Sequence, residues 1–400
     1  MNRLLRSSLL IVALLGSLAA CSSSASDQPV DTTTPAQVAT SVTPAKSSMS
    51  AVAIAAGGMN SCALLADTSV KCWGWNTQGE LGNGTKKDSS VPVAVSKLSG
   101  VTAIATGNSH SCALLADTSV KCWGGDVAGA LFDGTQDYHP TPVAVKGLSG
   151  VKEIAVGGFH SCALLADTSV KCWGFNSNGQ LGNGTQKDSS APVAVAELSG
   201  ATAIATGNSH SCVLLADASV KCWGGTSYRN DSTEGDSSTP VAVAGLSGVT
   251  AIAANGDHSC ALLADTSVKC WGDNLVGQLG NGTQEASLTP VAVSGLSGVT
   301  AIGLGGTHSC ALLADTSVKC WGYNYQGQLG ANTDPQGASS TPLAVEGLSG
   351  VKAITASPVH SCALLADASV KCWGANIKGQ LGNGTQKDSL TPVAVSGLFE

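Results

Sequence analysis

Basic side chains are scarce in this chain, and arginine is nearly absent. The 400 residues contain 20 Lys and Arg against 27 Asp and Glu. Without the first 20 residues, which hold Arg3 and Arg6, 18 basic residues face 27 acidic ones, for a formal charge of −9. Arg229 is then the one arginine left. Because proteins that bind nucleic acid need a concentrated basic surface, the composition argues against nucleic acid as a partner.

The sequence after residue 20 also lacks a long apolar run and any window with the period of a helix. A membrane-spanning helix needs about 20 consecutive apolar residues. The apolar runs present are short, rich in Val, Ile, Cys and Trp, and separated by Gly and Asn, which is typical of β-strands. We therefore predict an all-β fold.

The first 20 residues predict export. Arg3 and Arg6 precede an apolar run from Leu9 to Leu18, and small residues follow it, as in a secretory signal peptide. The tetrapeptide Leu18-Ala19-Ala20-Cys21 resembles a bacterial lipobox, in which cleavage before the cysteine leaves its sulfur lipidated. We predict a signal peptide over residues 1–20 and lipidation of Cys21. The alternative is an ordinary signal peptide with a chance cysteine.

Residues 21–50 are rich in Ser, Thr, Ala and Pro and have almost no large apolar side chains. Such a segment cannot bury enough surface to fold, so it predicts a flexible tether. Stable anchoring needs two or more acyl chains, which a lipidated Cys21 would supply. We expect an exported lipoprotein attached to a membrane of the bacterial envelope, either periplasmic or on the cell surface.

Residues 51–400 consist of seven similar units of about fifty residues. Each unit contains four short apolar runs, which in unit two begin at Val101, His110, Ser119 and Pro142. A period near fifty indicates a solenoid or a propeller. The second and third runs are apolar on both faces, as expected of sheets that are covered on both sides around a closed ring. The units begin at Ala51, Val101, Val151, Ala201, Val249, Val299 and Val351.

The motif GQLGNGT (Gly179 to Thr185), a following PVAV run and a stretch G-x-H-S-C-A-L-L that leads to WG resemble the repeat of the regulator of chromosome condensation family. The resemblance covers all seven units. It implies a seven-bladed β-propeller of four-stranded antiparallel blades over residues 51–400. Founding members of that family catalyse guanine-nucleotide exchange on the small GTPase Ran. No position of this chain matches their exchange residues, so exchange activity is the least favoured of the functions considered.

The connector from WG to the next PVAV run is the longest and the only one that varies in length. Long links suit a crossing between blades, and short links suit neighbouring strands. The spacing thus predicts that blade boundaries fall within these connectors. On this hypothesis Pro392 to Val395 completes the blade that begins at Ala51, and pairing of the N- and C-terminal strands closes the ring.

Fourteen of the 15 cysteines form pairs ten positions apart. In the predicted hairpin around Asp167, residues whose numbers add up to 334 face each other, which places Cys162 opposite Cys172 within disulfide range. Export favours oxidation. Reduced buried cysteines remain an alternative, as does zinc, although its usual closely spaced pairs are absent. The predicted disulfides join Cys62–Cys72, Cys112–Cys122, Cys162–Cys172, Cys212–Cys222, Cys260–Cys270, Cys310–Cys320 and Cys362–Cys372.

Alternating strand directions place the ADTS and LSG turns at one end of the ring, and the long connectors with the turn before HSC at the other. We call the latter the variable end. It carries eight of the nine aromatic residues that are not part of the repeated WG motif. Aromatic rings on loops of a rigid scaffold suit recognition, although chance variation of loops is the alternative. The predicted binding residues are Trp75, Phe159, Phe175, Tyr323 and Tyr325, with a depression at Gly125 between Trp75 and Phe175.

Repeated polar residues are predicted to be structural. Six histidines recur at one position, where we expect hydrogen bonds within blades, and seven Asp residues occupy hairpin tips. Units two and four instead carry unique ionisable residues in irregular loops, where a hydrolase, lyase or calcium site would lie. These are Asp126, Asp133, Asp137, Tyr138 and His139 in unit two, and Tyr228, Arg229, Asp231, Glu234 and Asp236 in unit four.

The favoured hypothesis is a non-enzymatic binding or scaffolding propeller that recognises a protein or a glycan with its variable end. It predicts no catalytic residue, no metal, no cofactor and a monomeric chain. The rival hypothesis is an envelope hydrolase or lyase that uses the irregular loops of units two and four.

Overall fold

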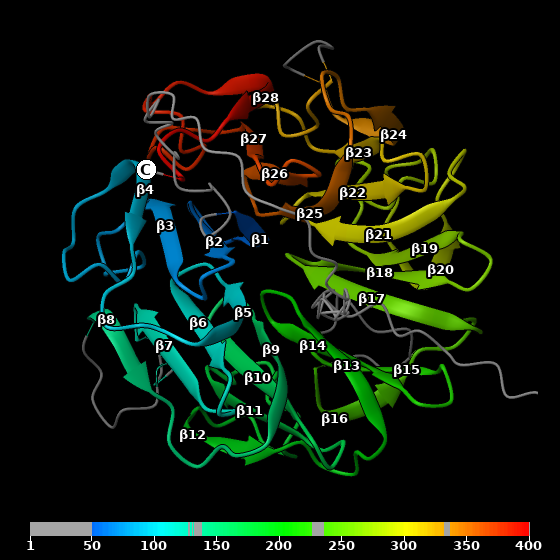
Figure 1. Cartoon of the computed structure of the whole chain (residues 1–400). Coiled ribbons are helices and arrows are strands. Elements are labelled where there is room, and N and C mark those ends of the chain that lie inside the picture. Colours follow the sequence, from blue (N-terminus) through cyan, green and yellow to red (C-terminus); the bar gives the residue numbers. More distant parts are fainter. Residues whose placement is uncertain are drawn as a thin grey trace, which may run out of the picture. The chain divides into compact units, whose positions relative to one another are not determined.

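The computed structural model describes residues 50–126, 129, 131, 138–225, 236–331 and 337–399. These residues belong to one compact unit, Ser48–Glu400. They form 28 strands in seven four-stranded antiparallel sheets, and each sheet is one blade of a propeller. Figure 1 shows the blades arranged around a central axis. The predicted seven-bladed all-β architecture is therefore confirmed. Across the described ranges, no helix is long and apolar enough to span a membrane.

The strands of each blade follow the chain from the centre of the ring to its rim (Figure 1). The innermost strands are β1 (Ala51–Ala56), β5 (Val101–Thr106), β9 (Val151–Val156), β13 (Ala201–Thr206), β17 (Val249–Asn255), β21 (Val299–Leu304) and β25 (Val351–Ala356). The second strands are β2 (Asn60–Leu65), β6 (His110–Leu115), β10 (His160–Leu165), β14 (His210–Leu215), β18 (His258–Leu263), β22 (His308–Leu313) and β26 (His360–Leu365).

The third strands are β3 (Val70–Gly74), β7 (Val120–Gly124), β11 (Val170–Gly174), β15 (Val220–Gly224), β19 (Val268–Gly272), β23 (Val318–Gly322) and β27 (Val370–Gly374). The outermost strands are β4 (Ser89–Ala94), β8 (His139–Ala144), β12 (Ser189–Ala194), β16 (Ser237–Ala242), β20 (Ser287–Ala292), β24 (Ser339–Ala344) and β28 (Ser389–Ala394). Every outermost strand contains at least one proline, and proline limits pairing of an exposed edge with another chain.

The predicted closure of the ring is wrong. The last strand, β28, pairs with β27 of its own repeat, with Lys371 opposite Ala394, and not with the blade that begins at Ala51. The long connector does not cross between blades, because it folds over the next blade and then returns. Gly84 in the first connector, for example, donates its N–H to the carbonyl of Pro140 in the second blade over 2.8 Å. The connector is therefore long because it covers the seam between two adjacent blades.

The hydrophobic core lies at the seams between adjacent blades. In the seam between the first two blades, Leu81 of the connector, fully buried, packs with Val70 of β3 and with Trp123 of β7. All seven repeated tryptophans are at most 1 % exposed, which confirms that they are packing residues. The second and third strands are buried on both faces, as predicted. Each blade therefore needs both neighbours to bury its apolar surface.

The seven predicted disulfides are all present in the structure. Cys162 is the register partner of Cys172, and Leu164 of Val170, as the sum of 334 requires. The Cα atoms of each bonded pair lie 4.0 or 4.1 Å apart. Each bond closes a short hairpin loop, for which the chain-entropy model gives roughly 2.5–3 kcal/mol of stabilisation.

We expect the exported protein to contain seven intramolecular disulfides and no free thiol among these 14 cysteines. Intact-mass spectrometry after alkylation in denaturant should show no label on them before reduction and 14 labels after reduction, because the sulfurs are oxidised. Protein refolded and kept under reducing conditions is the control. Alkylation of these cysteines in denatured, unreduced material would show that they are buried thiols instead.

Candidate binding face

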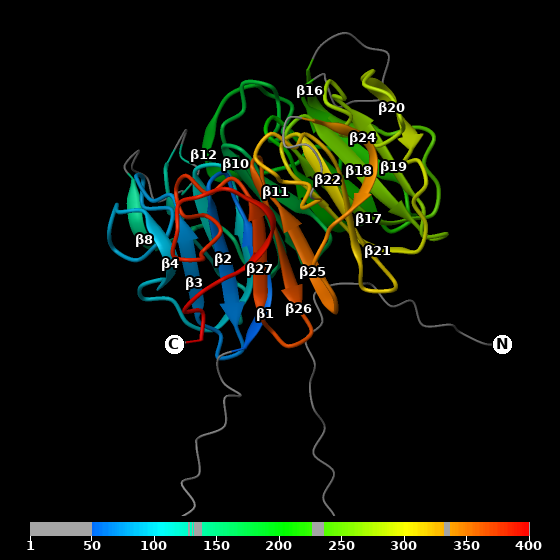
Figure 2. The same cartoon turned by 90° about the horizontal axis from the view of Figure 1, so that it is seen from above.

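The strand directions confirm the two predicted ends of the ring. Gly100 of an LSG turn donates its N–H to the Thr68 hydroxyl of an ADTS turn over 3.1 Å, which places these turns at one end. At the variable end, the N–H of Trp75 donates to the carbonyl of Met59 over 2.9 Å and joins the long connector to the turn before β2. Figure 2 shows the blades turned by 90°, with their strands side by side.

The bond between positions 75 and 59 recurs in all seven blades at 2.8–3.0 Å. It continues the register of the β2–β3 hairpin by one step, so two side chains stand next to each other at the same place on each blade. These two positions differ from blade to blade, whereas the strands beneath them hardly vary. We call them the variable pairs: Met59–Trp75, Ser109–Gly125, Phe159–Phe175, Ser209–Gly225, Asp257–Asp273, Thr307–Tyr323 and Val359–Ala375.

The predicted aromatic residues form two separate clusters and one isolated ring. Phe159 and Phe175 meet edge to face in the third blade, with centroids 6.4 Å apart. Tyr323 and Tyr325 stack in the sixth blade at 5.9 Å and 12°. Phe159 is 39 % and Tyr325 is 58 % exposed. These two blades lie on opposite sides of the ring (Figure 1), and Trp75 of the first blade joins neither cluster.

The depression predicted at Gly125 is occupied by a neighbouring side chain. A Cβ atom at Gly125 would collide with the amide of Gln78, which extends from the first connector onto the second blade. Ser109, the partner of Gly125, is buried. Trp75 and Phe175 therefore do not face each other across an empty space at this position.

The innermost strands line a narrow central channel. Its volume is about 280 Å³, and Ile54, Ile104 and several Ala and Thr side chains line it. The turns at the variable end converge on a second, smaller cavity that includes Asn108, Gly158 and Thr206. The smaller cavity therefore lies between turns that carry first members of the variable pairs.

The repeated histidines hydrogen-bond between blades, which corrects the prediction that they bond within blades. His160 Nε2 lies 2.8 Å from the Ser211 hydroxyl of the next blade. Ser211 donates to the carbonyl of Gln180 over 3.0 Å, so it accepts the proton of His160 Nε2. Trp223 Nε1 donates to the same carbonyl over 2.8 Å. We call this arrangement the seam network. A single blade's register cannot reveal it, because its members come from two repeats.

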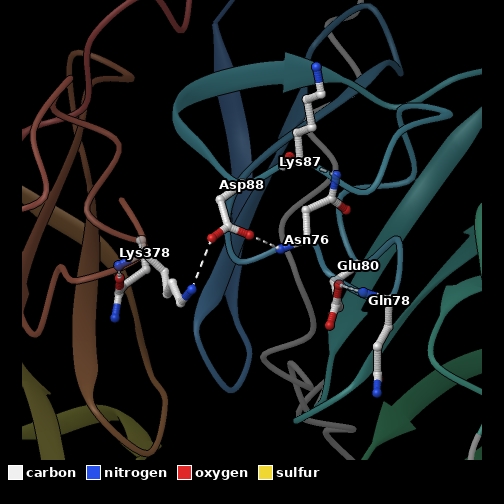
Figure 3. A network of polar contacts seen from close by, with 7 residues as sticks. Asn76, Gln78, Glu80, Lys87, Asp88 and Lys378 are labelled. Carbon is white, nitrogen blue, oxygen red and sulfur yellow. Dashed lines mark hydrogen bonds and ion pairs between the residues drawn. The ribbon is translucent and has the colours of Figure 1, made fainter.

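The last seam uses the same contacts. His360 Nε2 lies 2.6 Å from the Ser61 hydroxyl, and Trp73 Nε1 donates to the Gln380 carbonyl over 2.9 Å. An ion pair of 3.1 Å between Lys378 and Asp88 is added on the connectors (Figure 3). Side-chain and loop contacts between the seventh and first blades thus close the ring without a shared sheet.

Glu80 occupies a position at which four other repeats have glutamine (Figure 3). Its Oε2 accepts the N–H of Gln78 over 2.9 Å, while its buried Oε1 has no hydrogen-bond partner within the part of the chain that the structure describes. Burial raises the pKa of Glu80 to about 7. The protonated acid resembles glutamine in shape and charge, so this group is a structural substitute for glutamine. Its depth argues against a catalytic role.

The described ionisable residues of the irregular repeats do not assemble a reactive site. Asp126 is 5 % exposed, and its Oδ1 accepts the N–H of Leu131 over 2.8 Å. Asn176 makes the equivalent bond to Leu181 in the third repeat, so Asp126 has a loop-holding role. His139 begins β8, Tyr138 packs under Lys86, and Asp236 accepts the Asn178 amide. Asp133, Asp137, Tyr228, Arg229, Asp231 and Glu234 lie outside the described residues, as does Cys21.

Among the described residues, no group of three or more His, Cys, Asp and Glu side chains could hold a metal ion. The seven hairpin-tip aspartates are structural, as predicted. Asp167 Oδ1, for example, accepts the N–H of Ser169 over 3.0 Å and its hydroxyl over 2.7 Å. These two bonds lower the pKa of Asp167, with the side-chain bond the larger cause.

The sequence of the propeller also matches a known protein family. Two models of the regulator of chromosome condensation (RCC1) repeat match the chain. One matches all seven units, at residues 51–80, 101–129, 151–180, 201–230, 249–278, 299–328 and 351–380. The other matches residues 69–114, 169–214, 267–312, 317–364 and 367–400. The chain belongs to the RCC1 repeat family. No curated protein sequence matched it at a significant level.

Solved structures with the same fold include other RCC1 propellers. Prp20p from Saccharomyces cerevisiae is 22 % identical with a TM-score of 0.73, over 88 % of each chain. Human WBSCR16 is 24 % identical with a TM-score of 0.73, over 81 % of this chain and 92 % of its own. The ectodomain of the Physcomitrella patens receptor kinase CR4 is 21 % identical with a TM-score of 0.52, over 81 % and 74 %. At these identities the likeness establishes the fold.

The buried histidines of this RCC1-repeat chain predict a loss of stability in weak acid. Burial lowers the pKa of His258 from 6.5 to about 3, so the folded protein keeps this ring neutral while the unfolded chain protonates it below pH 6.5. Its contribution is complete above pH 6.5 and falls by about 1.4 kcal/mol per pH unit toward pH 3. His258→Asn should make the unfolding free energy depend less steeply on pH, because one proton fewer is taken up on unfolding. Urea denaturation from pH 7 to 5 measures this slope.

Asn60 is the natural precedent for that variant, because it occupies the same position in the first blade and donates to Ser111 over 3.4 Å. His139→Asn is the control for a histidine substitution outside the seam network, because His139 is the first residue of the outermost strand β8. Equal slopes for His258→Asn and the parent protein would mean that this histidine is protonated in the fold.

Proposed function

We propose that this chain is a non-enzymatic binding or scaffolding propeller that recognises a protein or a glycan through its variable end. The observation that carries the proposal is the set of variable pairs. Seven pairs of residues stand on the same backbone hydrogen bond, and they change from Phe–Phe to Asp–Asp to Ser–Gly between blades whose strands are similar. Recognition needs such a rigid frame with side chains that differ in size and charge.

The exposed aromatic clusters support this proposal. A Phe or Tyr side chain offers a large apolar area and loses little conformational freedom when it binds, so such residues dominate recognition surfaces. Phe159 and Tyr325 leave much of their rings in solvent. Protein binding is also recorded for relatives of this fold, since the structure of yeast RCC1 (Prp20) was solved with bound Kap60. Kap60 is a partner of that protein, and the partner of the present chain has to be identified by experiment.

The proposal places the propeller at the bacterial envelope, held by lipid on Cys21 and by the tether of residues 21–50. Disulfides in all seven blades support an oxidising compartment. The CR4 ectodomain shows that a propeller of this kind can form part of an ectodomain. An exported chain would not meet a nuclear GTPase, so exchange activity is not proposed. The structural role of Asp126 weakens the rival enzyme.

Phe175→Ala should weaken partner binding by about 1–3 kcal/mol, because it removes an anchor ring from the variable end. Stability should hardly change, since Ala375 occupies the same position in the seventh blade. The soluble domain, residues 48–400, would be tested against envelope proteins and glycans by pull-down, and the captured partner by calorimetry. Thr168→Ala is the control at the opposite end, where Ala218 and Ala368 are natural equivalents with the same positive φ.

If Thr168→Ala weakened binding while Phe175→Ala and Tyr325→Ala did not, the binding face would be the opposite end. If turnover of an envelope substrate depended on Asp137 or Arg229, the rival enzyme would replace the binding protein.

Anchoring has a separate test. Cys21→Ser should abolish incorporation of labelled fatty acid and leave the seven disulfides and the fold intact, because Cys21 is the one cysteine outside the pairs. Membrane fractionation of cells that express the full chain would show release of the variant. Continued labelling of the variant would contradict the lipoprotein assignment.

A further inference from the structure

One hydrogen bond at the variable end joins two blades that are not neighbours. Asn108 Nδ2, in the turn after β5, donates to Asn208 Oδ1, in the turn after β13, over 3.1 Å. The bond spans the third blade between them and passes over its Gly157-Gly158 turn. A Cβ atom at Gly158 would lie 3.3 Å from Asn208 Oδ1, so a side chain there would crowd the bridge. We call this pair the amide bridge.

The amide bridge keeps hydrogen-bonding capacity that the protein does not use. Each side-chain amide has one donor group and one acceptor oxygen, and the bridge uses the Asn108 donor and the Asn208 acceptor. The Asn108 oxygen and the Asn208 nitrogen have no partner among the described residues, and neither is a buried unsatisfied atom. A free acceptor and a free donor therefore remain on the two ends of the amide bridge, beside the small cavity that Asn108 lines.

An exposed aromatic residue is the next residue of the chain after the turn beneath the amide bridge. Phe159 comes after Gly158 in the chain and is held edge to face by Phe175. The variable pairs of the two adjacent blades, Ser109–Gly125 and Ser209–Gly225, have the smallest side chains of the seven. The exposed phenylalanine thus belongs to a blade flanked by two blades with small side chains at these positions, and it follows the glycine that lies close to Asn208.

The inner turns at the variable end, two of which carry the amide bridge, are almost free of charge. The inner turns of the variable end comprise residues 57–59, 107–109, 157–159, 207–209, 256–257, 305–307 and 357–359, and Asp257 is their one ionisable residue. It belongs to the fifth blade, two blades away from Phe159. A ligand with a phosphate, carboxylate or ammonium group would find no opposite charge there, and its desolvation would be uncompensated.

We propose that Phe159 and the amide bridge of Asn108 and Asn208 form a subsite for one uncharged sugar residue of a glycan. The proposal rests on the proposed function and narrows its ligand class. The C–H face of a sugar ring packs on the phenylalanine, as apolar groups pack on aromatic faces. Sugar hydroxyls can donate to the Asn108 oxygen and accept from the Asn208 nitrogen, because a hydroxyl is both donor and acceptor.

Three variants of the soluble domain test the subsite on an array of uncharged and anionic oligosaccharides, followed by calorimetry with the uncharged ligand that binds. Phe159→Ser, which copies Ser109, should weaken binding about tenfold or more. Asn208→Asp keeps an acceptor for Asn108 but replaces the free donor, and should weaken binding by a similar factor. Thr168→Ala, in an ADTS turn at the opposite end of the ring, should leave it unchanged. Urea denaturation of each variant checks that the fold persists.

The outcomes separate this subsite from the general function. Binding of an uncharged oligosaccharide that is lost in Phe159→Ser and Asn208→Asp supports the proposal. Sugar binding that survives Phe159→Ser and Asn208→Asp and also Thr168→Ala, or binding of a peptide or protein with no uncharged oligosaccharide bound, overturns the subsite and leaves the variable end as the binding face. Binding that survives Phe159→Ser and Asn208→Asp but is lost in Thr168→Ala overturns both.

Discussion

The seam network is the interaction on which the rest of the structure depends. Adjacent blades share no strand pairing, so the ring is held by apolar packing and by buried polar contacts repeated from seam to seam. At each fully described seam, one backbone carbonyl of the preceding connector accepts the indole N–H of a tryptophan, and the serine hydroxyl next to it meets a histidine or asparagine. A buried polar group costs about 1–3 kcal/mol when it is left unpaired. These contacts therefore fix how far each blade can move against its neighbours.

The seam also explains why the connectors are long and why they vary only in part. The segment that ends in Gln180 and Leu181 must reach the next blade, because Leu181 is fully buried and the Gln180 carbonyl is an acceptor of the seam network. Residues before this segment, such as Phe175 and Ser177, lie at the variable end and carry no such constraint. A ring of similar blades can thus present side-chain pairs that differ in size and charge from blade to blade without a change in its frame.

Much of this could be predicted from the sequence, because local register is a property of a single hairpin. The sum of 334 predicts the Cys162–Cys172 disulfide, and the same sum pairs Phe159 with Phe175 across the next step of the hairpin. The variable pairs can therefore be predicted from the hairpin register, because the register places each variable turn residue opposite the first residue of the connector. Without the register, the turn residues and the connector aromatics are two separate sets of variable residues. The periodicity also fixed the number of blades and which turns share an end.

Contacts between repeats could not be predicted in the same way. The bond from His160 to Ser211 and the amide bridge between Asn108 and Asn208 depend on how blades pack in space. The wrong closure has the same origin, since connector length reports a distance along the chain and not the direction of the loop. A long loop that covers a neighbour and returns has the same length as one that crosses over, and only the position of Gly84 beside Pro140 distinguishes them.

The central claim is that an invariant frame carries its recognition surface at one end of the ring. Hydrogen–deuterium exchange of the soluble domain with and without its captured partner tests this claim most directly. The account predicts slower exchange in peptides that contain the turns at residues 157–159 and 207–209 and the start of the connector at Phe175. It predicts no change in the ADTS turns, such as residues 166–169. Protection of the ADTS and LSG turns, with the variable end unaffected, would contradict it.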